Sequence, residues 1–164
     1  MAGTIDQCDC RTCDSRTEQI QIVMPGDTNG YGRLFGGRLM EWIDIVAAVV
    51  GRRHSGREVI TASIDHLHFS APAYLNNTVV LIGRVTYAGH TSVEVCVDTY
   101  AEDISGERRM INQAYVLMVA LDENEKPTPV PGIELVSDEQ RAEWARGKER
   151  CELRKRKRLG GTCN

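Results

Sequence analysis

A carboxylate lies inside a strongly apolar segment of this chain, shortly after a glycine-rich turn. The stretch NGYGRLFGGRLMEWID covers residues 29–44 and brings Asn29, Gly37 and Asp44 into one local unit. Burying a carboxylate without a partner is costly, so we expect Asp44 to face a polar partner, solvent or a substrate. The backbone N–H groups at the start of a helix lack intrahelical acceptors, and such donors suit an oxygen that gains negative charge.

These three residues are candidates for the hydrolysis of an acyl compound. In that chemistry the N–H groups near Gly37 hold the oxyanion, Asp44 takes a proton from water, and Asn29 orients water or substrate. The alternative is that Asp44 is an exposed helix residue and Asn29 a turn former. The motifs of P-loop proteins, serine hydrolases and dinucleotide-binding folds are absent from the sequence.

Two further polar groups could carry chemistry. The turn GHTS at residues 89–92 combines a glycine, an imidazole and two hydroxyls, and it could hold a phosphate. An ordinary hairpin turn is the alternative reading. His66 and His68 lie two apart on one predicted strand face but lack a third ligand, so a structural or surface role is expected for them.

The element that positions Asp44 is a helix predicted from about Gly36 to Arg53. Apolar residues cover most of its circumference, which is typical of a buried helix: Leu39, Met40, Trp42, Ile43, Ile45, Val46, Val49 and Val50. One narrow stripe of the helix is not strongly apolar, and it consists of Glu41, Asp44, Ala48 and Gly51. This stripe is expected to face something other than the core.

Extended segments are predicted on both sides of this helix in the sequence. Alternating or continuous apolar residues indicate strands at 17–25, 59–70, 78–88, 91–101 and 110–121. Their connections after the helix are short and rich in turn residues, which favours antiparallel neighbours. Ten-residue strands span roughly 33 Å and the helix roughly 27 Å, so the helix can lie along the concave face of one curved sheet. The predicted fold class is α+β.

A proline-rich segment at 122–136 leads to a C-terminal helix, which begins near Ser137 with a capping-box pattern completed by Gln140. This helix has few apolar anchors, so we expect loose packing or packing against a partner subunit. The basic run RKRKR near its end is either solvated or set against a phosphate, RNA or an acidic partner. The predicted organisation has three parts: a flexible N-terminal arm at 1–16, a main domain at 17–136, and the C-terminal helix with its basic tail at 137–164.

Composition is ordinary for a globular protein, with 41% hydrophobic and 26% charged residues among 164. A net charge of −3 gives no reason to expect a nucleic-acid partner. No segment has the pattern of a signal peptide or a membrane span, so we expect a cytoplasmic protein with reduced thiols. Cys8, Cys10 and Cys13 could ligate a soft metal if Cys163 or a second chain supplied a fourth ligand; a reduced N-terminal arm is the main expectation.

Three blocks of the sequence together resemble the acyl-CoA thioesterases of the hotdog fold, and among them the cytosolic acyl-CoA hydrolases. The blocks are DTNGYGRLFGGRLMEWID, TASIDHLHFSAPAYLNNTV and VTYAGHTSVEVCVDTYAE. The resemblance covers about residues 17–121. It implies a long helix wrapped by an antiparallel sheet, and protomers that join their sheets edge to edge. It also implies that such dimers often form a hexamer, with active sites at the dimer interface.

The resemblance also implies roles for individual residues. Asn29 matches the asparagine of the glycine-rich turn and Asp44 the helix carboxylate, which in the family reach one site from opposite subunits. Gly37 matches the helix-start glycine whose N–H polarises the thioester carbonyl. The CoA-binding residues that the resemblance implies, in the phosphate turn and beside the pantetheine arm, are Gly89, His90, Thr91, Ser92, Thr61 and Ser63.

The implied reaction converts acyl-CoA and water to a free fatty acid and CoA. A positioned base contributes ~10²–10⁴-fold and one oxyanion donor roughly 10²–10³-fold. Neither a metal nor a cofactor is therefore predicted, and CoA enters only as part of substrate and product. Attack by Asp44 itself stays open as an alternative.

Two other functions also stay open. The first is a non-catalytic module that binds CoA or a nucleotide through residues 89–92. The second is a hotdog dehydratase or hydratase. Those enzymes generally pair the carboxylate with a histidine, and no histidine lies in the predicted helix or its glycine turn.

Overall fold

The computed structural model describes residues 10–11 and 15–160 of the chain. Its elements in chain order are β1 (Cys10–Arg11), β2 (Thr17–Ile22), η1 (Pro25–Asp27), α2 (Gly36–Ser55), β3 (Glu58–Phe69), β4 (Thr78–Ala88), β5 (Ser92–Glu102), β6 (Arg108–Leu121), β7 (Ile133–Glu134) and α3 (Asp138–Gly160). The long helix and the five main strands are those predicted from the sequence, and β4 has the predicted bounds.

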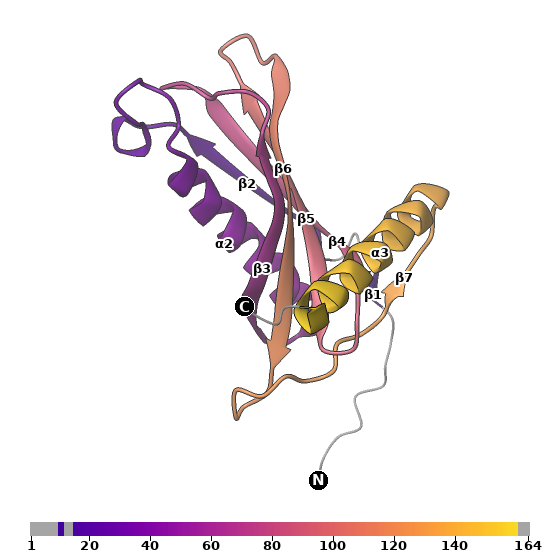
Figure 1. The fold of residues 1–164 in the computed structure, drawn as a ribbon. Coiled ribbons are helices and arrows are strands. Elements are labelled where there is room, and N and C mark those ends of the chain that lie inside the picture. Colours follow the sequence, from indigo (N-terminus) through magenta and orange to yellow (C-terminus); the bar gives the residue numbers. More distant parts are fainter. Residues whose placement is uncertain (1–9, 12–14, 161–164) are drawn as a thin grey trace.

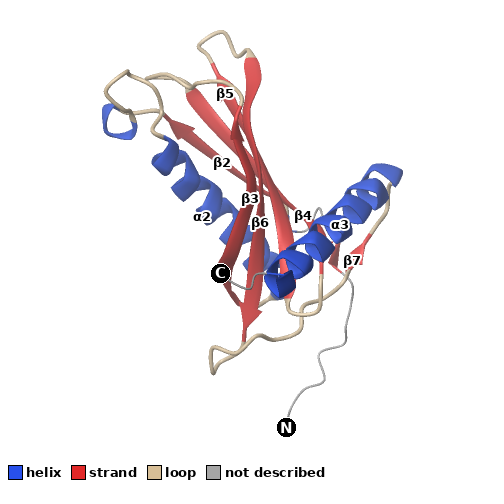
Figure 2. Ribbon diagram, viewed as in Figure 1, coloured by secondary structure: helices blue, strands red, loops and turns tan. Residues whose placement is uncertain are grey.

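A curled antiparallel sheet wraps around α2, and α3 lies on the opposite side of that sheet (Figure 1 and Figure 2). The strand order in the sheet is β2-β4-β5-β6-β3, so β2 and β3 are its edge strands. The short hairpin connections explain the antiparallel pairs β4–β5 and β5–β6. The α+β prediction is therefore confirmed, with one helix along the inner face of one sheet.

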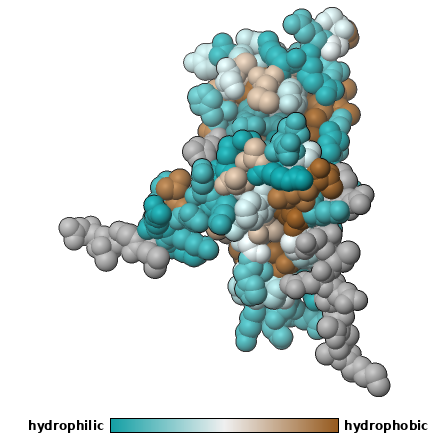
Figure 3. Space-filling model, turned by 90° about the vertical axis from the view of Figure 1, so that its right-hand side faces the viewer, coloured by the Kyte–Doolittle hydropathy of each residue, from teal (hydrophilic) through white to brown (hydrophobic). Residues whose placement is uncertain are grey.

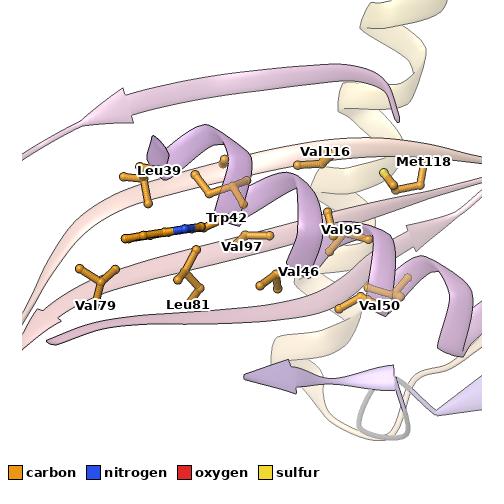
Figure 4. Close-up of a cluster of buried hydrophobic side chains, with 14 of the residues drawn as sticks. Leu39, Trp42, Val46, Val50, Val79, Leu81, Val95, Val97, Val116 and Met118 are labelled. Atoms are coloured by element: carbon orange, nitrogen blue, oxygen red, sulfur yellow. The ribbon is translucent and has the colours of Figure 1, made fainter. Parts of the chain in front are cut away.

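The hydrophobic core lies between α2 and the inner face of the sheet (Figure 4). The helix contributes Leu39, Trp42, Ile43, Val46, Ala47 and Val50, which face alternate residues of β4, β5 and β6 such as Val79, Leu81, Val95, Val97, Val116 and Met118. Burial of each large side chain stabilises the fold by about 1.5–3 kcal/mol. A Cβ atom on Gly83 of β4 would lie 2.6 Å from Val46 Cγ1, so the missing side chain lets the helix approach the sheet closely.

Ion pairs hold α3 against the outer face of the sheet, and the expectation of loose packing was wrong. The pairs are Arg84–Glu143 at 2.6 Å, Glu94–Arg150 at 2.7 Å, Glu94–Arg154 at 2.8 Å and Asp65–Arg154 at 2.7 Å. The Glu94 side chain is 0% exposed. Arg150 and Arg154 of α3 thus pair with carboxylates on the outer face of the sheet, and Glu143 of α3 pairs with an arginine there.

Burial on this outer face changes the pKa of several groups. Burial lowers the pKa of Arg84, but its hydrogen bonds to Glu143 and Asp98 outweigh that effect and raise it above the ordinary arginine value. Burial and the nearby charge of Asp98 raise the pKa of the Cys96 thiol to about 12. Burial, with Cys96 beside it, likewise raises the pKa of Tyr115 to about 12.

The ends of the chain add two details. The predicted capping box is present: Ser137 Oγ accepts from Gln140 N at 3.2 Å and Gln140 Oε1 accepts from Ser137 N at 3.3 Å. Two residues of the predicted N-terminal arm form β1, which pairs in parallel with β7. The proposed metal ligands Cys8, Cys13 and Cys163 lie outside the described residues.

The surface on the α3 side is mostly hydrophilic, with apolar patches between the charged groups (Figure 3). Of the basic run, Arg154 belongs to the ion-pair network, whereas residues 155–158 are exposed. No helix in the described part of the chain is both long and apolar enough to cross a membrane.

Candidate active site

Asp44 lies on α2 and contacts Thr61 on the edge strand β3. The Thr61 hydroxyl donates to Asp44 Oδ1 at 2.5 Å, and it also lies 3.5 Å from Met118 Sδ. Asp44 is half-buried, so its carboxylate has a polar partner and is not enclosed in the core. The helix stripe predicted to face something other than core does so at Glu41 and Asp44, but the prediction is wrong for Ala48, which packs against the core. Its far end, Gly51, is buried and packs against Val59 and Met118.

The start of α2 presents free backbone donors, as predicted for Gly37. Phe35 precedes the helix with extended backbone, and its carbonyl accepts from Arg38 N at 3.0 Å and Leu39 N at 3.1 Å. The N–H groups of Gly36 and Gly37 come before these bonds and have no intrahelical acceptor. A Cβ on Gly37 would lie 2.6 Å from the Phe35 ring. The absence of a side chain on Gly37 therefore leaves room for the Phe35 ring at the helix start.

The side chain of Asn29 is oriented by the turn that follows it. Its Oδ1 accepts from Tyr31 N at 3.0 Å and from Arg33 N at 3.3 Å, and Asn29 N donates to Arg33 O at 2.8 Å. Because two N–H donors occupy the oxygen end of the amide, the Nδ2 end is the one that can donate outward. Asn29 is thus prepared to contact an oxygen atom of a ligand.

A pocket of about 430 Å³ joins Asn29 to the start of α2. Its polar lining is Asn29, Arg33 and Ser70, beside Gly36. Its apolar lining consists of Leu34, Leu39, Phe69, Ala71, Pro72, Ala73 and Ile111. The pocket therefore combines an apolar wall with a few polar groups, which is the usual composition of a small-molecule site.

One subunit holds the candidate catalytic residues in two separate groups. Asn29 and the helix start share the pocket, whereas Asp44 and Thr61 do not line it. Seven residues of helix place Asp44 roughly 10 Å along the axis from Gly37. Asn29 and the Asp44–Thr61 pair of one subunit therefore do not share a pocket.

The turn predicted to bind phosphate closes the β4–β5 hairpin. Gly89 N donates to Ser92 O at 2.8 Å, and the carbonyls of His90 and Thr91 each accept a backbone N–H at 3.0 Å from the chain at and after the end of β6. Ser92 pairs with Val119 of β6, which pairs with Ile60 of β3. The turn therefore lies at the same end of the sheet as the Asp44–Thr61 contact, two strands away.

Three residues have surroundings that the sequence did not predict. The hydroxyl of Thr61, implied as a CoA contact, bonds to Asp44, and only the alternation of β3 hinted at that face. Ser63 Oγ is buried without a hydrogen-bond partner among the described residues. The helix does carry a histidine, because α2 continues to Ser55 and includes His54. That imidazole is buried and its Nε2 lies 3.0 Å from Pro131 O, ten residues beyond Asp44.

Known proteins similar to this chain match it over the segment that contains α2 and β3. The model of the thioesterase superfamily matches residues 31–106. An uncharacterized acyl-CoA thioester hydrolase of Bacillus subtilis is 40% identical over 121 residues, which are 73% of this chain and 70% of the relative. The cytosolic acyl coenzyme A thioester hydrolase of Rattus norvegicus is 30% identical over 90% of this chain, which spans only 40% of that relative.

Solved structures of acyl-CoA hydrolases have the same fold. The Staphylococcus aureus acyl-CoA hydrolase, solved with butyryl coenzyme A, coenzyme A and coenzyme A disulfide, has a TM-score of 0.87 and 32% identity over 93% of each chain. Variants of that enzyme with an aspartate, an asparagine or a threonine replaced by alanine have also been solved. An apo-hexameric acyl-CoA thioesterase has a TM-score of 0.88 and 37% identity over 93% of this chain and 98% of that one.

A helix wrapped by a curled antiparallel sheet, together with these matches, defines a hotdog-fold thioesterase. Within this superfamily the chain belongs to the acyl-CoA thioester hydrolases, because its bacterial relative and its structural neighbours carry that description over most of their length.

Proposed function

We propose that this chain hydrolyses the thioester bond of acyl-CoA and releases a carboxylic acid and CoA. The observation that carries the proposal is the Asp44–Thr61 contact between α2 and the edge strand β3 in a member of this hydrolase family. A half-buried carboxylate held by one hydroxyl keeps its second oxygen available for a proton.

In the proposed reaction Asp44 acts as the general base. Its Oδ2 takes a proton from water while the water oxygen attacks the thioester carbon, and the proton is returned to the departing thiolate. The Thr61 hydroxyl keeps Oδ1 occupied and fixes the carboxylate plane. Direct attack by Asp44 on the carbonyl carbon is the alternative route, with water then hydrolysing the acyl-enzyme.

Asn29 orients water or substrate, because the bonds that its Oδ1 accepts leave Nδ2 to donate outward. The donor for the oxyanion is the N–H of Gly37 at the start of α2. A pre-positioned donor of this kind is worth roughly 10²–10³-fold in rate.

We propose that a complete site uses two subunits. The separation of Asn29 from the Asp44–Thr61 contact is explained if Asn29 of one protomer meets Asp44 and Thr61 of its partner. Large apolar side chains on and near the β3 edge support such a dimer: Ile60 is 52% exposed and Ile45 46% exposed. A trimer of these dimers would match the hexameric neighbour.

The substrate's CoA part is assigned to the end of the sheet that carries the Asp44–Thr61 contact. In this proposal the turn at 89–92 lies near the phosphates, and the unpartnered hydroxyl of Ser63 on β3 offers a hydrogen bond to the pantetheine arm. No cofactor takes part. As for the relatives described as cytosolic, we propose a cytoplasmic location.

The first test measures thiol release from a panel of acyl-CoA chain lengths. Asp44→Ala is expected to lower kcat by ~10²-fold or more with a smaller change in KM. Glu41→Gln is the matched control, because Glu41 is an exposed carboxylate one turn earlier on α2 that pairs with Arg38 at 2.6 Å. Turnover by Asp44→Ala equal to that of Glu41→Gln would refute the assignment of the base.

The second test examines the two-subunit site. Co-expressed Asp44→Ala and Asn29→Ala subunits should regain about a quarter of wild-type activity, because half of randomly mixed dimers contain one intact site of two. Each variant alone should stay inactive. Failure of the mixture to regain activity, with mixed dimers shown to form, would place both residues in a site within one subunit.

A further inference from the structure

The pocket beside Asn29 contains a cation that the proposed reaction does not use. Among the described residues that line it, Arg33 alone carries a charge. Its carbonyl accepts from Asn29 N at 2.8 Å, and its N–H donates to Asn29 Oδ1 at 3.3 Å. The two residues therefore face one pocket from a single rigid turn.

The guanidinium of Arg33 has no carboxylate within ion-pair distance in the described part of the chain. Arg38, five residues later, shows the contrast, because it pairs with Asp27 at 3.1 Å and Glu41 at 2.6 Å. Arg33 instead lies over the ring of Tyr74, with its Cζ 5.9 Å from the centroid. A guanidinium whose face lies over an aromatic ring keeps its N–H edges available for an anion with paired oxygens.

The surroundings favour an anion from the substrate. Seven of the other lining residues are apolar, and a low-polarity wall strengthens the attraction between a guanidinium and a bound anion. The backbone of Arg33 is also fixed on its other side, through a bridge to Tyr74. Arg33 is therefore a cation of the pocket lining whose backbone is held on both sides.

We propose that Arg33 is a specificity residue that binds an anionic oxygen group of the acyl-CoA substrate. The group is either a carboxylate at the far end of the acyl chain or a phosphate of CoA. Both offer the paired oxygens that a guanidinium binds through two N–H bonds. The inference rests on the proposed hydrolase function, because the pocket is assigned to substrate through Asn29.

The experiment compares kcat/KM for three sets of thioesters. The first set pairs acyl groups of equal length with and without a terminal carboxylate: succinyl- and butyryl-CoA, then glutaryl- and pentanoyl-CoA. The second replaces CoA by dephospho-CoA, and the third uses acyl-pantetheine, which lacks all the phosphates. The variants are Arg33→Gln and Arg33→Lys. Arg146→Gln is the control, because it removes the same charge from an exposed position on α3.

A carboxylate ligand predicts that Arg33→Gln lowers kcat/KM about ten-fold or more for the carboxylated substrates and less than two-fold for the neutral ones. A phosphate ligand predicts the same loss for every CoA thioester and none for acyl-pantetheine. In both cases Arg33→Lys retains part of the rate, and Arg146→Gln behaves as wild type.

Unchanged kcat/KM in Arg33→Gln for all three sets would overturn the inference, and so would an equal loss in Arg146→Gln. Either result leaves the hydrolase proposal intact, provided that the wild-type protein releases thiol from acyl-CoA. Absence of thiol release by the wild type would instead remove the proposed function itself.

Discussion

Glu94 is a fully buried carboxylate between the sheet and α3, and its removal tests whether ion pairs hold α3 in place. Its side chain is 0% exposed and accepts hydrogen bonds from Thr86 Oγ1 at 2.7 Å, Arg150 Nη2 at 2.7 Å and Arg154 Nη2 at 2.8 Å. In Glu94→Gln the side-chain shape is kept and the charge is lost. Arg154 retains its pair with Asp65, whereas Arg150 loses its anionic partner and keeps its contact with the Tyr115 ring.

The expected loss of folding free energy follows from leaving a buried arginine without its carboxylate. The Arg150 side chain is only 14% exposed, so its charge cannot simply be solvated. Breaking a buried ion pair costs 3–5 kcal/mol, and we expect about 3 kcal/mol because the ring of Tyr115 still faces the guanidinium. For a chain of this size that corresponds to a fall in Tm of roughly 6–12 °C. The matched control is Glu102→Gln. Its pair with Arg108 is partly exposed, so a loss of about 0–1 kcal/mol is expected.

The assay uses the two tryptophans of the chain, which report on different layers. Trp42 is 6% exposed in the core beneath the sheet, and Trp144 lies on α3 with its ring 5.4 Å from that of Tyr87. Single-tryptophan variants are unfolded in urea. In the Glu94→Gln background the Trp144 signal should change at a lower urea concentration than the Trp42 signal. Equal midpoints for Glu94→Gln and Glu102→Gln would refute the reasoning.

Two further perturbations test the core and the outer face. Gly83→Ala should destabilise the fold by about 1–3 kcal/mol, because its Cβ would lie 2.6 Å from Val46 and 2.9 Å from Val50; thermal unfolding measures it against Gly26→Ala, where the Cβ meets nothing within 4 Å. Burial raises the pKa of Cys96 from 9.0 to about 12, so the unfolded chain loses this proton first and stability should fall between about pH 9 and 12. Cys96→Ala should flatten the fall of Tm over that range, and parallel curves for the variant and the wild type would contradict the assignment.

The inner layer of the fold could be predicted from the sequence because its signals are local. Periodic apolar residues give α2 and the strands, and hairpin residues give their antiparallel order. The outer layer could not be predicted in the same way. Glu94 and Arg150 are 56 positions apart, and no local pattern in either segment predicts that they pair. A helix with few apolar residues was therefore expected to be loose, although its arginines meet a row of buried or half-buried carboxylates.

The candidate site likewise has features that local sequence patterns predict and features that depend on contacts between distant segments. The position of Asp44 on the less apolar stripe of α2 and the open N–H groups at Gly37 follow from helix geometry alone. The hydroxyl that holds Asp44 comes from β3, and its identity depends on the register between a helix and an edge strand that local patterns do not encode. The orientation of Asn29 depends on a turn in which two backbone N–H groups select the oxygen end of the amide. Each half of the site is thus built by contacts within one protomer. The proposed mechanism needs both halves at one carbonyl, and for that reason the mixed-subunit experiment tests it more directly than any single substitution.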